Sequence, residues 1–168
     1  MTKQLEDTFL AALEQNQQKL FRICTVYSST SEDAKDLFQE VLVHIWKAIP
    51  TFESKSSIGT WMFRVTINVC LRFRSKHTKR IDRFINLDSV TISQMNEEPK
   101  RDEQNEQLIN LRHCIKQLND SDKAVIALYL EELPYKEISN ITGITENTVA
   151  VKIKRIKKKL LNCLNAKL

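Results

Sequence analysis

The sequence predicts an all-α protein in which two small helical domains are joined by a polar linker and the second domain holds a helix-turn-helix. Three observations point to this fold class. Apolar residues recur at steps of three and four over most of the 168 residues, which is the period of an amphipathic helix. Two glycines and three prolines are too few for the many tight turns of a β-sandwich or barrel. One central stretch, rich in acidic residues, lacks any hydrophobic period.

Composition narrows the classes of function. The 26 lysines and arginines exceed the 21 acidic residues, and 42% hydrophobic residues supply enough apolar surface for packed cores. The scarcity of glycine excludes a glycine-rich phosphate loop, so nucleotide-dependent chemistry lacks its usual motif. The four cysteines (Cys24, Cys70, Cys114 and Cys163) show no metal-ligand spacing, so we expect buried, reduced thiols and no metal or other cofactor. Because no signal core or membrane-length apolar run is present, we expect a cytoplasmic protein without direct membrane insertion.

The first domain consists of predicted helices separated by clear breaks. Hydrophobic spacing indicates one long helix or two short ones over residues 5–27. A capping pattern at Thr30 opens the next helix, whose apolar and acidic faces lie opposite each other, and Pro50 ends it. The polar residues 51–58 are expected to form a loop. A third helix is predicted from about Gly59 to Lys76.

A polar linker over residues 85–107 separates a first domain, residues 1–84, from a second, residues 108–168. Helical periodicity fails in the linker, and its second half is strongly acidic. Its 23 residues reach about 80 Å when fully extended but only about 27 Å as a flexible coil. A fixed distance between two binding sites therefore requires a partner that orders the linker. Helical spacing resumes at Leu108, and again after the cap-forming residues 119–122.

The second domain ends in the pattern of a helix-turn-helix. A short helix is predicted over residues 135–142, a left-handed residue at Gly143 ends it, and Thr145 caps a second helix. That second helix buries an apolar stripe made of Val149, Ile153, Ile156 and Leu160. From residue 147 to the end the chain has seven basic residues and no acid, as expected of a helix that lies against phosphates. A surface helix in an ordinary helical bundle is the alternative.

Three stretches resemble conserved segments of bacterial sigma factors of the extracytoplasmic function (ECF) group, the smallest members of the sigma-70 family. They are residues 33–40 (DAKDLFQE), 60–68 (TWMFRVTIN), and 133–139 (LPYKEIS) followed by Thr148-Val149. Their order and separation match the family's two conserved domains over about residues 8–165. The resemblance implies a non-enzymatic transcription initiation factor that binds core RNA polymerase and directs it to specific promoter DNA. It also implies an anti-sigma factor as a further partner, and no small-molecule substrate.

The resemblance assigns polymerase binding to the acidic face of the second helix. In the family this face docks on the clamp helices of the largest polymerase subunit. The matching positions here are Asp33, Asp36, Gln39 and Glu40. A merely solvated acidic face is the alternative, because helical periodicity alone does not separate the two.

The resemblance assigns recognition and melting of the minus-10 promoter element to the predicted loop and the helix that follows it. The loop, which receives a flipped base in the family, contributes Phe52, Glu53, Ser54, Lys55, Ser56 and Ser57, and the helix contributes Trp61, Arg64 and Asn68. An amide side chain can pair with a base edge, and an indole can replace lost base stacking. For Trp61, packing in the core is the alternative. Ile58 stands where an aromatic residue is common, so no stacking role is transferred to it.

The helix-turn-helix is assigned by the resemblance to the major groove at the minus-35 element. Its candidate DNA contacts are Thr148, Lys152, Lys154, Arg155 and Lys158. Relatives often carry a basic residue and a serine where this chain has Ala150 and Val151. Neither side chain donates a hydrogen bond to a base edge, but a small apolar group can contact the methyl group of thymine.

Two other classes of protein are alternatives. A DNA-processing enzyme, such as a recombinase or nuclease, needs a catalytic serine with basic partners or an acidic metal cluster. Asp33, Asp36 and Glu40 share one helix face and are candidate metal ligands, although Lys35 lies among them. A response-regulator output domain accounts for residues 108–165 but leaves the first domain unexplained.

Overall fold

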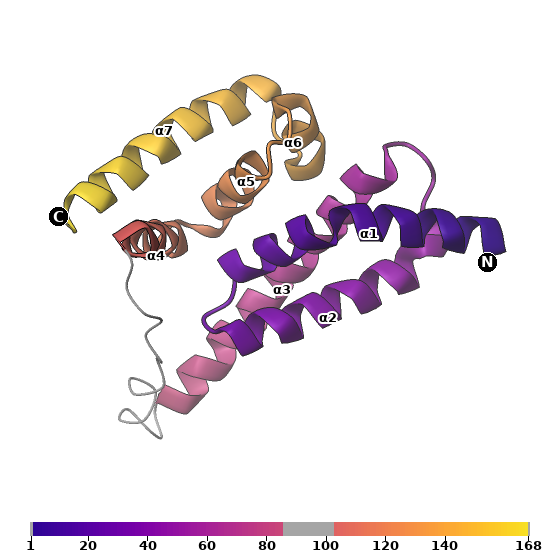
Figure 1. The fold of residues 1–168 in the computed structure, drawn as a ribbon, viewed down its shortest axis with the longest axis horizontal. Coiled ribbons are helices and arrows are strands. Elements are labelled where there is room, and N and C mark those ends of the chain that lie inside the picture. The colour runs from indigo at the N-terminus through magenta and orange to yellow at the C-terminus, as the bar shows by residue number, and fades with distance from the viewer. Residues whose placement is uncertain (1, 86–102, 168) are drawn as a thin grey trace.

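The computed structural model describes residues 2–85 and 103–167, and it describes the side chains of residues 2–73 and 106–167 (Figure 1). The α-helices are α1 (Lys3–Val26), α2 (Ser31–Ala48), α3 (Ile58–Ile85), α4 (Glu103–Lys116), α5 (Asp120–Leu130), α6 (Tyr135–Thr142) and α7 (Glu146–Asn165). A short 3-10 helix, η1 (Ile49–Thr51), follows α2, and the described residues contain no strand. The all-α fold class is confirmed. Most of the predicted linker, residues 86–102, lies outside the described residues.

Helices α1, α2 and α3 pack against one another as the first bundle (Figure 1). Their apolar stripes meet in a core that includes Phe9, Leu20, Leu37, Val41, Met62 and Phe63. The predicted cap of α2 is confirmed, because Thr30 Oγ1 accepts a hydrogen bond from the backbone N–H of Asp33 at 3.1 Å. Pro50 lies in η1, directly after α2 ends, where its missing N–H interrupts no α-helical hydrogen bond.

Helices α4 to α7 form the second bundle, and the structure confirms the caps of α5 and α7 and the turn after α6 that the sequence predicts. Asn119 caps α5 by accepting a hydrogen bond from the Asp122 N–H at 2.8 Å. Gly143 ends α6 at a φ of +80°, which glycine adopts without the steric cost that a Cβ brings. Thr145 caps α7 through a 3.2 Å hydrogen bond from the Thr148 N–H. The helix-turn-helix is thus confirmed from cap to cap.

Helix α3 differs in length from the prediction. It begins at Ile58 and continues to Ile85, well past the predicted end near Lys76. The sequence contains no glycine or proline between Gly59 and Pro99, and the basic residues in this stretch are good helix formers. The helix thus continues past the stretch in which the sequence shows a clear hydrophobic period.

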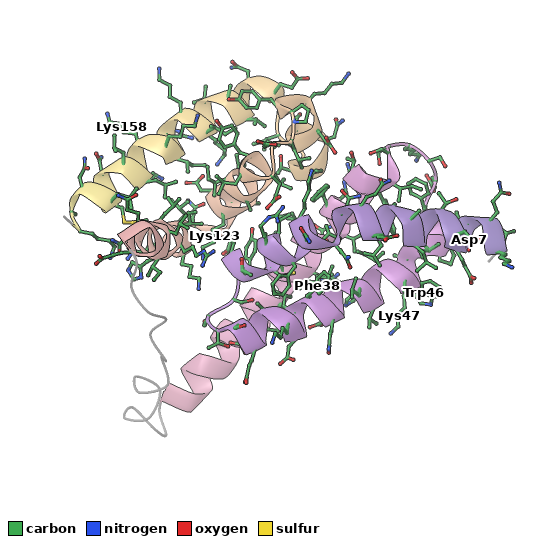
Figure 2. All side chains as sticks on the ribbon, viewed as in Figure 1. Asp7, Phe38, Trp46, Lys47, Lys123 and Lys158 are labelled. Atoms are coloured by element: carbon green, nitrogen blue, oxygen red, sulfur yellow. A yellow bond between two sulfur atoms is a disulfide. The ribbon has the colours of Figure 1, made fainter. Side chains whose placement is uncertain are left out.

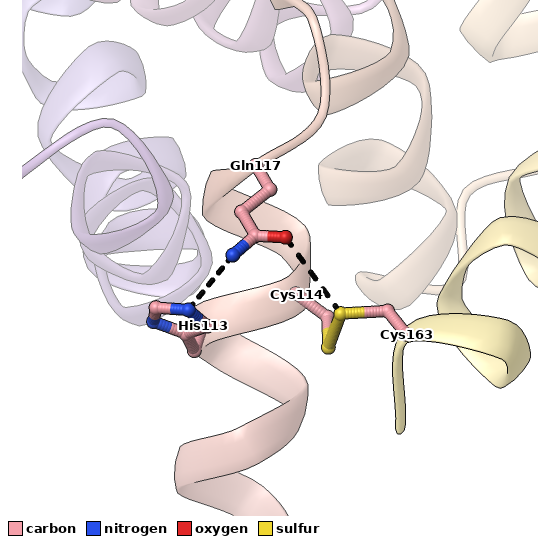
Figure 3. Close-up of a disulfide and its surroundings, with 4 residues drawn as sticks. All are labelled: His113, Cys114, Gln117 and Cys163. Atoms are coloured by element: carbon pink, nitrogen blue, oxygen red, sulfur yellow. Dashed lines mark hydrogen bonds between the residues drawn. A yellow bond between two sulfur atoms is a disulfide. The ribbon is translucent and has the colours of Figure 1, made fainter. Parts of the chain in front are cut away.

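The cysteines fall into two pairs, which corrects the expectation of four reduced thiols. Cys114 on α4 and Cys163 on α7 form a disulfide, with Cα atoms 6.0 Å apart (Figure 3). Cys24 and Cys70 are buried and free. A hydrogen bond with the Cys24 thiol, together with burial, raises the pKa of Cys70 well above its usual value. The sequence did not predict the disulfide because its cysteines are 49 residues apart and only helix packing brings them together.

Candidate nucleic-acid and polymerase interfaces

Helix α7 presents a basic face outward. Val149, Ile153, Ile156 and Leu160 are buried against the rest of the second bundle, as the sequence predicts. On the opposite face the exposed side chains are Asn147, Val151, Lys154, Arg155 and Lys158. Figure 2 shows Lys158 on α7, at the edge of the molecule away from the first domain. The described acidic side chains of α7 are confined to Glu146, so the net charge of this face is positive, and its positive charge is concentrated at Lys154, Arg155 and Lys158.

Two lysines of α7 turn inward to a buried carboxylate. Lys152 and Lys159 each lie 3.2 Å from an oxygen of Asp122, whose side chain is only 7% exposed. Burial alone raises the pKa of the Asp122 carboxyl, but hydrogen bonds from Lys159 and Lys152 outweigh it and hold that pKa below its usual value. Lys152, a predicted DNA contact, therefore joins α7 to the start of α5.

The other predicted DNA contacts of α7 do not all point in the same direction. Thr148 is half-buried, and its hydroxyl lies 2.8 Å from the hydroxyl of Thr145, so it belongs to the helix cap. Lys154, Arg155 and Lys158 remain directed to solvent. Sequence reasoning missed Asn147 as a candidate contact. The sequence contains a signal for it, because helical spacing places Asn147 about 160° around the helix from the buried Val149 and therefore on the outer face.

The predicted minus-10 loop is anchored by aromatic packing. The rings of Phe52 and Trp61 lie 5.6 Å apart, and each packs edge-on against the buried Phe9, at 5.7 Å and 5.5 Å respectively. Phe52 and Trp61 are both half-buried. Trp61 therefore contributes to packing, as the alternative interpretation expected, while part of its indole stays accessible. This contact fixes the loop against the start of α3.

The polar residues of the loop lie at its surface. Glu53 and Lys55 form an exposed ion pair at 2.6 Å, and Ser54 between them has a φ of +58°. Ser56 donates a hydrogen bond to the Ser57 carbonyl at 3.2 Å. Ser57 Oγ in turn accepts a 3.1 Å hydrogen bond from the Thr60 N–H at the start of α3. The loop thus offers charged and hydroxyl groups to solvent on an ordered backbone.

The outer face of α3 carries Arg64 and Asn68, one helical turn apart and both exposed. Helix α6 of the second domain lies against this face. The Arg64 guanidinium donates a hydrogen bond to the backbone carbonyl of Asn140, and Thr60 Oγ1 donates one to Glu137 Oε1 at 2.6 Å. The two domains therefore meet at the first turns of α3, and this contact engages Arg64, one of the residues predicted to bind the minus-10 element.

A second contact between the domains is an ion pair with two hydrogen bonds. The Arg22 guanidinium of α1 donates to both carboxylate oxygens of Glu131, each at 2.7 Å. The Glu131 side chain is 7% exposed, whereas that of Arg22 is 55% exposed. The hydrogen bond with Glu131 raises the pKa of Arg22. Nearby, the Tyr27 hydroxyl donates to the Asp120 carbonyl at 3.4 Å.

The outer face of α2 combines acidic and apolar groups. Asp36 and Gln39 are exposed, and Asp33 and Glu40 are half-buried, so all four predicted polymerase contacts reach the surface on one side of the helix. The same side exposes Val43 at 49% and Trp46 at 47%, next to Lys47 (Figure 2). The sequence interpretation did not include Val43 and Trp46, although their helical positions place them among the acids.

Neither metal ligation nor a membrane span emerges from the described residues. In that part of the chain, no three His, Cys, Asp or Glu side chains are grouped so as to hold a metal ion, and this includes the acids of α2. Among the helices described, none is long and apolar enough to cross a membrane.

Two helical bundles, the second with a helix-turn-helix and a basic outer helix, form an arrangement that is typical of DNA-binding proteins. Comparison with models of known protein families identifies the family of each bundle. The family model described as Sigma-70 region 2 matches residues 12–80, and the one described as Sigma-70, region 4 matches residues 108–160. The chain belongs to the sigma-70 family, and the resemblance to ECF sigma factors is confirmed.

Individual relatives agree with this assignment. The ECF RNA polymerase sigma factor SigG of Mycobacterium tuberculosis is 40% identical over 63 residues, which are 38% of this chain and 17% of the length of SigG. The RNA polymerase sigma factor SigV of Bacillus subtilis is 24% identical over 148 residues, covering 87% of this chain and 84% of SigV. The match to SigG is thus confined to a small part of that protein.

Solved structures share the fold. The sigma factor RpoE of Bartonella quintana, solved with the anti-sigma factor NepR, has a TM-score of 0.68 and 22% identity, and the match covers 98% of both chains. CnrH, solved with the cytosolic domain of CnrY, has a TM-score of 0.71 and 17% identity, covering 97% of this chain and 91% of CnrH. These likenesses extend over both helical domains.

Proposed function

We propose that this protein is a transcription initiation factor that binds core RNA polymerase and directs it to specific promoters. It recognises and helps to melt the minus-10 element with its first domain, and it reads the minus-35 element with its second. The observation that carries the proposal is the match to both sigma-70 regions in one chain, each on a bundle with an exposed face suited to its task. The protein has no catalytic activity of its own, needs no cofactor and acts in the cytoplasm.

Helix α7 binds the major groove at the minus-35 element. Lys154, Arg155 and Lys158 supply the positive charge that holds the helix against phosphates. Lys152 acts indirectly, because its ion pair with Asp122 sets the angle between α7 and α5. Thr148 acts through the helix cap, which fixes the backbone of the first turn.

The loop before α3, together with Arg64 and Asn68, binds the minus-10 element. Glu53, Ser54, Lys55, Ser56 and Ser57 provide the polar groups that a flipped base requires. Phe52 and Trp61 support this loop through their contact with Phe9, and the accessible part of the Trp61 indole stacks at the edge of the melted DNA. The amide of Asn68 pairs with a base edge.

The outer face of α2 binds core polymerase. Asp36 and Gln39 lie at its centre, flanked by Asp33 and Glu40. The exposed Trp46 lies on the same side, and a large aromatic residue surrounded by charges is typical of the residues that dominate binding energy at protein interfaces. This face is accessible in the structure, whereas the minus-10 face of α3 is partly covered by α6.

An anti-sigma factor is the second protein partner. RpoE and CnrH, which share the fold over nearly the whole chain, were solved with the anti-sigma factor NepR and with the cytosolic domain of CnrY respectively. By analogy, such a partner binds this protein and masks the surfaces used for polymerase and DNA.

Run-off transcription with purified core polymerase tests the proposed function. The templates are DNA fragments from the source genome, and the reactions differ only in the presence of the protein. Discrete transcripts that require the protein support a sigma factor, and their start sites locate its promoters. Absence of both transcripts and polymerase binding refutes the proposal, and DNA cleavage with added divalent metal supports the enzyme alternative. The matched variant is Asp36→Arg, which changes an exposed position on the polymerase face and should reduce the protein-dependent transcripts.

A further inference from the structure

Two uncharged side chains interrupt the basic outer face of α7 in its first two turns. Asn147 and Val151 are both exposed, Val151 at 49%, and they lie four residues apart on the same side of the helix. The exposed Val151 is an apolar group on a face of lysines and arginines, and it is accessible to an apolar group of a ligand that lies against this face.

The other side chains in the first two turns of α7 either make contacts within the protein or lie off the outer face. Thr148 is part of the helix cap, and Lys152 is paired with Asp122. Ala150 is half-buried at the flank. Glu146 is exposed but lies about 60° from the buried Val149, on the side nearer the bundle. Asn147 and Val151 are therefore the side chains that this part of the helix presents directly away from the protein.

Their chemistry corresponds to two different bases. In the major groove, an asparagine amide makes paired hydrogen bonds to N6 and N7 of adenine, and an apolar side chain contacts the C5-methyl group of thymine. Base contacts come from the first turns of a recognition helix, whereas contacts to phosphates fix the register of the protein and carry no sequence information. Lys154 and Lys158, further along the same face, fit the second role.

The helical rise fixes how far apart the two bases are. Four residues advance about 6 Å along an α-helix, and base pairs are about 3.4 Å apart. We propose that Asn147 reads an adenine and Val151 reads a thymine one or two base pairs away within the minus-35 element. This inference rests on the proposed function and names the DNA sequence feature that the second domain selects.

A barcoded run-off experiment tests this inference. A promoter located by its start site is randomised over its minus-35 window, and core polymerase with the full-length protein transcribes the pool. Among the transcripts, wild type is expected to enrich an adenine and a thymine separated by one or two steps. Asn147→Ala should lose the preference for adenine, by about 5- to 150-fold, and keep that for thymine. Lys158→Ala is the matched control, because it should weaken transcription from all sequences alike and lower the salt dependence.

A chemical substitution in the DNA isolates the contact with Val151. Replacing the selected thymine by deoxyuridine removes only the C5-methyl group. Wild type should lose severalfold in transcription from that template, whereas Val151→Ser should transcribe both templates equally. Transcripts without an adenine or thymine preference, or an equal response of both proteins to deoxyuridine, overturn this inference and leave the proposed function intact. Absence of any protein-dependent transcript refutes the proposed function, and the inference with it.

Discussion

Reduction of the Cys114–Cys163 disulfide is expected to destabilise the second domain by about 4 kcal/mol. The bond joins residues 49 positions apart. In the chain-entropy model, a closed loop of that length lowers the entropy of the unfolded chain and so raises its free energy by about 4 kcal/mol at 25 °C. Urea unfolding followed by circular dichroism, with and without a thiol reductant, measures the difference. With a slope of about 2 kcal/mol per molar urea, the midpoint should fall by about 2 M on reduction.

The matched control for this experiment is Cys163→Ala. Cys163 is only half-buried, so the substitution removes the bond with little loss of packing. This variant should unfold near the midpoint of the reduced wild type and should not respond to reductant. If mass spectrometry shows fully reduced wild type and its midpoint has not moved, the entropic reasoning is refuted. A reductant response of the variant would instead implicate the buried free thiols.

Three further predictions concern charged side chains and the exposed Trp46. Arg22→Ala leaves the buried Glu131 carboxylate without its guanidinium, so the domains should separate more often and small-angle scattering should report a larger radius; an unchanged radius contradicts a role for this pair. The pKa of Asp122 is lowered on folding, so its ion pairs contribute stability above about pH 4 that is lost as the pH falls through the folded pKa. Asp122→Asn should flatten this acid dependence in thermal unfolding, and an unaltered pH profile would count against it. Asp36→Arg and Trp46→Ala should each weaken polymerase binding at least tenfold in a pull-down titration without changing the melting temperature; wild-type affinity in both would rule out α2 as the docking face.

The fold could be predicted largely because its signals are local. The caps at Thr30 and Thr145 and the left-handed turn at Gly143 depend on a few adjacent residues, and the structure confirms each. The length of α3 and the disulfide were predicted wrongly. The first depends on helix propensity in a stretch of sequence without a hydrophobic period, and the second depends on how α4 and α7 approach each other.

The candidate interfaces could be predicted in composition but only partly in direction. The sequence indicated that α7 is basic, yet only the structure shows that Lys152 turns toward Asp122 while Lys154 and Lys158 point outward. Trp46 was overlooked although its position on α2, on the same side as Asp36 and Gln39, could be read from the sequence, and the structure exposes it. The side of a helix that is buried depends on the helices packed against it, and a helical wheel drawn for one helix carries no information about those neighbours.

The contact between α6 and α3 has a consequence for any measured affinity. Arg64 is engaged by the Asn140 carbonyl, and Thr60 one turn before it by Glu137, so if DNA binds through Arg64 as proposed, it binds only those molecules in which the domains have separated. The apparent dissociation constant is the intrinsic one divided by the open fraction, and every 1.4 kcal/mol in favour of the closed form weakens apparent binding about tenfold. A partner that separates the domains removes this factor without touching the DNA. The isolated chain is then a poor guide to its own promoter affinity, and its selectivity is expressed only after assembly.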